Sequence, residues 1–120
     1  MALAPQNYRL DPRLMELSFG EWEGLGWREV ARVDSAGVEA RKADKWGFTP
    51  PGGESYATLT ARVKTWLNER DGDIFLAAHG GVGRALMVLL TGMARDVADS
   101  ADIWQGRALI FENGAFAWVG

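Results

Sequence analysis

A short apolar run, a histidine–glycine turn and a longer apolar run constrain the fold of this chain more than any other segment. Residues 74–78 read as a buried strand, Gly80 and Gly81 as a turn, and residues 82–90 as a nearly all-apolar helix. Strand, turn and helix in this order are typical of α/β proteins. The pattern therefore predicts an α/β fold in which His79 lies at the carboxyl end of a strand and the start of a helix.

His79 is the only histidine of the chain. The first turn of a helix favours anions, because its N–H groups are unpaired and its dipole end is positive. Glycines let the backbone approach a ligand closely, and imidazole can donate to a phosphoryl oxygen or transfer protons. A histidine that merely caps the helix fits the same pattern. Taken alone, the turn indicates either a phosphate-handling site or a cap.

Before this unit, the sequence predicts loops and short helices. Residues 14–26 are rich in Gly, Trp and Glu and suggest a structured loop with one short helical turn. Residues 27–33 and 38–46 are helix candidates, with a break near Gly37. Residues 49–53, Thr-Pro-Pro-Gly-Gly, interrupt the pattern again because proline and glycine disfavour a continuing helix.

An amphipathic helix is expected from Ser55 to about residues 71–72, since apolar side chains recur there at helical spacing. After the apolar helix, Gly92 is a plausible C-cap and residues 95–101 suit a shorter helix. The tryptophans are expected to anchor the core and the loops; they are Trp22, Trp27, Trp46, Trp66, Trp104 and Trp118.

The chain ends in a predicted hairpin. Residues 107–111 and 115–119 flank Asn113-Gly114, a strong type I′ turn signal. An interior parallel strand at residues 74–78 needs strand neighbours on both sides, and the hairpin offers the only other strands. The predicted sheet therefore lacks a strand.

Composition restricts the class of protein. A chain of 120 residues suits one small domain, and a net charge of −3 gives no basic field that would attract nucleic acid. The lack of cysteine excludes disulfide and thiolate chemistry and is compatible with a reducing cytosol. No signal-peptide pattern and no apolar run of about 20 residues occur, so we expect a cytoplasmic protein that does not enter membranes. No nucleotide-binding fingerprint or metal-ligand cluster is visible, and no cofactor or metal is expected.

Glu16 lies in the segment Leu-Met-Glu-Leu-Ser-Phe-Gly-Glu-Trp-Glu-Gly, residues 14–24, which holds three carboxylates within eight residues. Such a group could include a general acid. Taken alone, solvated loop charges or salt-bridge partners explain the same pattern better.

Two further residues are candidates for a substrate-binding loop. Glu54 follows Pro-Pro-Gly-Gly at a helix start, where amide donors could bind a ligand. A turn with a helix cap explains that segment too and is the favoured interpretation, with substrate gating as the alternative. Arg84 follows His79 by five residues and could reach a phosphate or pair with a carboxylate; the structural interpretation is slightly favoured.

Together, these segments resemble the histidine phosphatase superfamily, which has the phosphoglycerate-mutase-like three-layer α/β fold. The resemblance runs from about Leu14 to the C-terminus and is nearer to the small bacterial phosphatases than to glycolytic mutases. Three blocks in the family's order carry it: residues 14–24, which resemble the acid-bearing loop; residues 50–55 with Arg62-Val63; and residues 77–81 with 84–86, which resemble the second-histidine motif.

The resemblance implies roles for three residues. Glu16 would be the general acid/base that protonates the leaving oxygen and then activates water. His79, with the Gly80 amide, would stabilise the transferring phosphoryl group. In the family the nucleophile is another histidine, in an Arg-His-Gly motif after the first, central strand, and a further arginine clamps the phosphate. No histidine precedes Leu14 here, so the resemblance implies that residues 1–120 form a single partial domain without that strand.

A complete domain of this kind would hydrolyse phosphate monoesters through a phosphohistidine. We expect little or no activity from this chain, because that route requires the absent nucleophile. The alternative is a non-catalytic pseudo-enzyme that binds a phosphorylated ligand or a protein partner. The expected ligand is phosphate or a phosphorylated small molecule, and an exposed sheet edge would favour a homodimer. The sequence does not specify the substrate.

Overall fold

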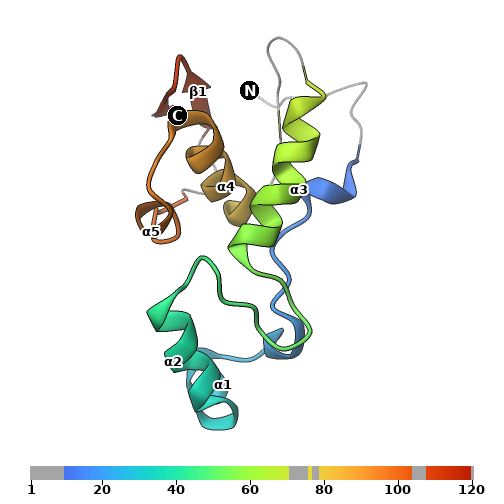
Figure 1. Cartoon of the computed structure of the whole chain (residues 1–120), viewed down its shortest axis with the longest axis vertical. Helices are drawn as coiled ribbons and strands as arrows, with labels where there is room; N and C mark the ends of the chain where they lie inside the picture. Colours follow the sequence, from blue (N-terminus) through green and yellow to red (C-terminus); the bar gives the residue numbers. More distant parts are fainter. Residues whose placement is uncertain (1–9, 71–75, 77–78, 104–107, 120) are drawn as a thin grey trace.

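Two helices, α3 (Tyr56–Asn68) and α4 (Gly80–Thr91), pack against each other at the centre of the structure (Figure 1). The structure is a computed structural model that describes residues 10–70, 76, 79–103 and 108–119. Apolar side chains on one face of α3 meet the buried side of α4, as their helical spacing predicts. This core contains Leu17, Trp46, Tyr56, Leu59, Val63, Val82, Ala85, Leu86 and Ala98.

The sequence predicted both central helices, with errors in the bounds of each. Helix α3 ends at Asn68, earlier than the expected end near residues 71–72. Helix α4 begins at Gly80, so Gly80 and Gly81 form its first turn and not the expected turn before residue 82, and it extends to Thr91, one residue past the expected end. Gly92, whose φ of 72° is left-handed, is its C-cap, as predicted. The predicted strand at residues 74–78 lies outside the described residues except for Leu76, so the strand stays a prediction.

Helices α1 (Trp27–Val33) and α2 (Ser35–Ala43) form a pair at the opposite end of the molecule from the C-terminal hairpin (Figure 1). The expected break near Gly37 is wrong, because α2 already begins at Ser35. Asp34 separates the two helices, and its carboxylate accepts a hydrogen bond from the Gly37 amide at 2.9 Å. This N-cap stabilises the start of α2 and allows glycine within its first turn.

Two short 3₁₀ helices precede this pair: η1 (Pro12–Leu14) and η2 (Gly20–Trp22). Helix η2 confirms the helical turn expected within residues 14–26. Trp22, Trp46 and Trp66 are buried, as expected of anchoring tryptophans. Trp27 is 55% exposed and contributes little to the core, while Trp104 lies outside the described residues.

The hairpin consists of β1 (Ala108–Glu112) and β2 (Ala115–Val119), paired antiparallel. Both turn residues have positive φ, 51° at Asn113 and 76° at Gly114, which confirms the predicted type I′ turn. The hairpin contacts α4, and it is the only sheet within the part of the chain that the structure describes. A homodimer through its edge stays a prediction.

Helix α5 (Arg95–Ala98) is shorter than the expected 95–101 and packs against α4. The radius of gyration, 15.6 Å, exceeds the value of about 14 Å for a compact chain of this length. The molecule is therefore elongated, with α1 and α2 extending away from the α3–α4 centre (Figure 1). Among the helices of the described ranges, none has the length and apolarity needed to cross a membrane. The cytoplasmic location stays a prediction.

Candidate functional site

The structure brings the acid-bearing loop to the first turn of α4. The Gly81 amide donates to the Glu16 carboxylate, with distances of 3.2 Å to Oε1 and 3.5 Å to Oε2. The Leu17 amide also donates to Oε1, at 2.8 Å. A negative group is stabilised at this place by the positive end of the helix dipole. Two of the predicted site segments, 65 residues apart along the chain, therefore meet.

His79 occupies the N-cap position of α4, and its side chain is exposed. Its carbonyl accepts a hydrogen bond from the Gly83 amide at 3.2 Å, so the backbone of His79 belongs to the helix start. Its side chain makes no capping hydrogen bond. The capping interpretation therefore describes the backbone of His79 but not its imidazole.

The two glycines after His79 have different surroundings. A Cβ at Gly81 would overlap Oε1 of Glu16 and lie 3.1 Å from the nearest methyl carbon of Leu59. A Cβ at Gly80 would meet Ile103 and Nη1 of Arg84 only at ordinary contact distances of about 3.5 Å. The close approach of Glu16 to the helix thus depends on glycine at position 81.

Glu54 lies next to Ser18 of the acid-bearing loop and forms an ion pair with Arg62 of α3. The distance between Arg62 Nη2 and Glu54 Oε1 is 2.5 Å, and both side chains are about four-fifths buried. The Ser18 amide donates to Glu54 Oε1 at 3.2 Å, and the Glu54 amide donates to the Ser18 carbonyl at 2.9 Å. These contacts fasten Glu54 to the loop that carries Glu16; a substrate-gating role for Glu54 stays a prediction.

The Pro-Pro-Gly-Gly segment has a backbone role at this place. It forms a turn in which the Gly53 amide donates to the Pro50 carbonyl at 2.8 Å. The Glu21 amide donates to the Pro51 carbonyl at 2.8 Å, which joins the turn to the acid-bearing loop. Ser55 then caps α3 by accepting from the Thr58 amide at 3.0 Å. The segment therefore starts α3 and supports the loop of residues 14–24.

Arg84 links α4 to neighbouring segments. Its Nε donates to the Ala101 carbonyl at 2.9 Å, and its Nη1 donates to the Tyr56 hydroxyl at 3.2 Å. Tyr56 is buried and stacks on Trp46, with ring centroids 5.4 Å apart. These contacts hold the guanidinium near the first turn of α4, and phosphate contact by Arg84 stays a prediction.

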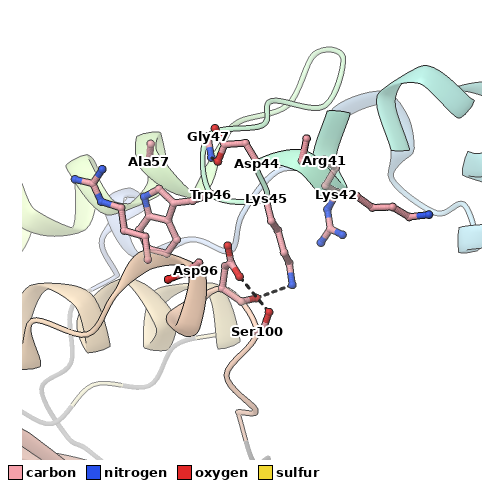
Figure 2. Close-up of a pocket in the computed structure, with 12 residues that line it drawn as sticks. Arg41, Lys42, Asp44, Lys45, Trp46, Gly47, Ala57, Asp96 and Ser100 are labelled. Atoms are coloured by element: carbon pink, nitrogen blue, oxygen red, sulfur yellow. Dashed lines mark hydrogen bonds between the residues drawn. The ribbon is translucent and has the colours of Figure 1, made fainter. Parts of the chain in front are cut away.

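A separate charged cleft of about 730 Å³ lies between the end of α2 and α5 (Figure 2). Lys45 extends across it and donates to the Asp99 carbonyl at 2.5 Å. Burial lowers the pKa of Lys45 below its ordinary value, and the nearby positive charge of Arg41 lowers it further. Asp44, Asp96 and Asp99 also line the cleft, so charges of both signs are mixed there.

Sequence reasoning did not identify this cleft, because the segments that line it are far apart in the chain and carry no motif. It also assigned no role to Arg62. The pairing of Glu54 with Arg62, eight residues apart, was a usable signal, since both residues occurred in a block of the resemblance.

Chemically, the arrangement at α4 offers a carboxylate, an exposed imidazole and helix amides in one place, which suits anion binding and proton transfer.

Comparison with known proteins places this geometry in context. Residues 2–112 match the family model of the histidine phosphatase superfamily (branch 1). A 2,3-bisphosphoglycerate-dependent phosphoglycerate mutase from Methylobacterium sp. (strain 4-46) is 30% identical over 112 residues, covering 84% of this chain and 52% of that protein. The chain thus spans about half the length of the curated relatives it matches.

Two solved structures share the fold. The α-ribazole phosphatase from Shigella flexneri superposes with a TM-score of 0.71 at 24% identity, covering 89% of this chain and 56% of that one. A mycobacterial glucosyl-3-phosphoglycerate phosphatase, solved as a complex with VO₃, gives a TM-score of 0.65 at 23% identity, covering 92% and 61%. The described elements are therefore arranged as in phosphoglycerate-mutase-like phosphatases.

Proposed function

This chain belongs to the histidine phosphatase superfamily, and from that membership we propose that its site binds the phosphoryl group of a phosphate monoester. The observation that carries the proposal is the Glu16 carboxylate, which accepts a hydrogen bond from the first turn of α4, two residues beyond His79. A negatively charged group already lies where helix amides and the helix dipole favour an anion.

Each residue has a distinct role in this proposal. The His79 imidazole and the Gly80 amide hold oxygens of the phosphoryl group, whose negative charge they stabilise. In the family's two-step route a second histidine attacks phosphorus and takes the phosphoryl group as the ester bond breaks. In that route Glu16 would give a proton to the leaving oxygen and later accept one from the water that attacks the phosphohistidine. The names of the relatives, a mutase and phosphatases of phosphate esters, support this class of substrate and no single member of it.

The phosphohistidine route implied by the resemblance uses two histidines, and these 120 residues contain one. With His79 assigned to phosphoryl stabilisation, the nucleophile of that route is not among them. We therefore propose that residues 1–120 by themselves bind phosphate and hydrolyse its esters slowly or not at all.

Binding can be tested directly because the lone histidine gives an unambiguous NMR signal. Titration with inorganic phosphate, and separately with vanadate, should move the His79 ring resonances and the Gly80 amide along one saturable curve. Sodium chloride at matched ionic strength controls for screening. Resonances of His79 and Gly80 that stay unmoved up to saturating phosphate and vanadate would refute the proposed site.

Turnover is tested with p-nitrophenyl phosphate, comparing the wild-type chain with His79→Ala. We expect both proteins to hydrolyse p-nitrophenyl phosphate at the same rate, equal to the background rate without protein. A wild-type rate that disappears in His79→Ala would show that the 120 residues hydrolyse phosphate esters alone, contrary to the proposal.

The single histidine also favours the alternative, a non-catalytic protein that binds a phosphorylated ligand or partner. Saturable phosphate binding without hydrolysis would agree with it, and hydrolysis that depends on His79 would exclude it.

A further inference from the structure

Arg62 makes more contacts than a surface cation on α3 would require, and they join α3 to the backbone around Glu16. Its Nη1 donates to the Arg13 carbonyl at 2.7 Å, and its Nη2 donates to the Glu16 carbonyl at 3.3 Å. The same guanidinium pairs with Glu54, which accepts from the Ser18 amide. One planar side chain thus binds the backbone at residues 13 and 16 directly and, through Glu54, the backbone of Ser18.

The loop needs such support because residues 15–19 form no helix or strand. Within it, the buried side chain of Leu17 enters the α3–α4 core, while Glu16 is exposed beside it. An exposed carboxylate on an irregular segment would otherwise sample many positions, since little else restricts its backbone.

Glu16 is therefore held at two places. Arg62, on α3, binds its backbone carbonyl, and Gly81, on α4, binds its carboxylate. Because α3 and α4 pack directly on each other, the two anchors belong to one packed unit. The packing of α3 on α4 therefore sets the position of the Glu16 segment relative to the N-terminus of α4.

We propose that Arg62, with Glu54 as its ion partner, is a positioning residue that holds the Glu16 carboxylate against the first turn of α4. The inference rests on the proposed function of Glu16 as the acid/base group. It adds that the block containing Glu54 and Arg62 serves the site through the backbone of the acid-bearing loop, without touching the substrate.

The Gly81 amide reports the position of the carboxylate without any turnover. In the ¹⁵N-labelled chain, Glu16→Gln should shift this amide, because its hydrogen-bond acceptor loses its charge. The same substitution in an Arg62→Met background should shift the amide by about half as much or less, because the Arg13 and Glu16 carbonyls each lose a hydrogen bond and Glu54 loses its ion partner. Arg62→Lys, which keeps the charge but not the planar fork, should restore part of it.

Lys64→Met is the matched control: it removes an exposed cation from the same helix and should leave the Gly81 shift unchanged. If Arg62→Met does not fold, Glu54→Gln provides the second variant and should weaken the same response. A full Gly81 response in a folded Arg62→Met chain, or in both Glu54→Gln and Arg62→Lys, would overturn the inference. The Gly81 measurement needs no phosphate, so a negative result there refutes the positioning role of Arg62. An unmoved His79 signal in the phosphate titration refutes the proposed binding site instead.

Discussion

Gly81→Ala tests whether the acid-bearing loop and α4 form one site. The added Cβ would overlap Oε1 of Glu16 and approach Leu59 at 3.1 Å. Since the carboxylate is the flexible end of a side chain, it can move away, and the hydrogen bond from the residue 81 amide should be lost. The substitution should therefore displace Glu16 without unfolding the protein.

The expected change in stability is small because two effects oppose each other. Alanine in place of glycine within a helix stabilises it by up to about 1 kcal/mol. Loss of a carboxylate from an exposed helix N-terminus costs about 0.3–1 kcal/mol, and Leu59 must shift by a few tenths of an ångström. We expect the free energy of unfolding to stay within about 1 kcal/mol of wild type.

The assay is a double-mutant cycle of Gly81→Ala with Glu16→Gln, in which urea unfolding measures the free energy of unfolding of each protein. Gly81→Ala should remove most of the stability effect of Glu16→Gln, giving a coupling energy of about 0.3–1 kcal/mol. Gly83→Ala is the matched control, since its Cβ would meet only Ile103, at 3.3 Å. Two results would refute the reasoning: additive effects of the two substitutions, or a fall in the free energy of unfolding of more than about 3 kcal/mol in Gly81→Ala alone.

Three further changes have defined outcomes. Leu59→Ala, at a fully buried position of α3, should lower the free energy of unfolding by about 3–5 kcal/mol in urea melts. Hydrogen bonds from Arg13 lower the pKa of Asp11 from 3.8 to about 2. The stabilisation by Asp11 should therefore be complete above its ordinary pKa and disappear as the pH falls toward 2. A carboxyl NMR titration of Arg13→Ala should show the pKa of Asp11 raised toward its ordinary value, while the residue 13 amide still donates to the carboxylate. Asn113→Val should destabilise the hairpin by about 1–2 kcal/mol, seen as faster amide exchange in β1 and β2, because valine tolerates a φ of 51° poorly; unchanged exchange would contradict that argument.

Local patterns predicted several elements because their causes are local. Asn113-Gly114 predicted its turn, since few residue pairs adopt positive φ twice in succession. Gly92 predicted the end of α4 for a similar reason. The break assigned to Gly37 was wrong because the capping side chain of Asp34 outweighed the low helix propensity of glycine.

The candidate site was only partly predictable. Glu16, His79 and Gly80 were selected on motifs, and the structure adds that Glu16 reaches the turn that follows His79. The sequence could not show that Arg62 binds the backbone carbonyls of Arg13 and Glu16. Such contacts depend on carbonyl groups, which every residue carries and which leave no trace in a sequence.

The sequence by itself determined the family, the principal helices, the hairpin turn and the candidate residues of the site, because motif order, apolar spacing and turn chemistry are properties of short segments. Tertiary structure alone decided how these residues meet. The packing of α3 on α4 places the acid-bearing loop at a helix N-terminus, with Gly81 allowing the approach and Arg62 holding the backbone. Contacts between segments dozens of residues apart arise only when a shared core brings those segments together.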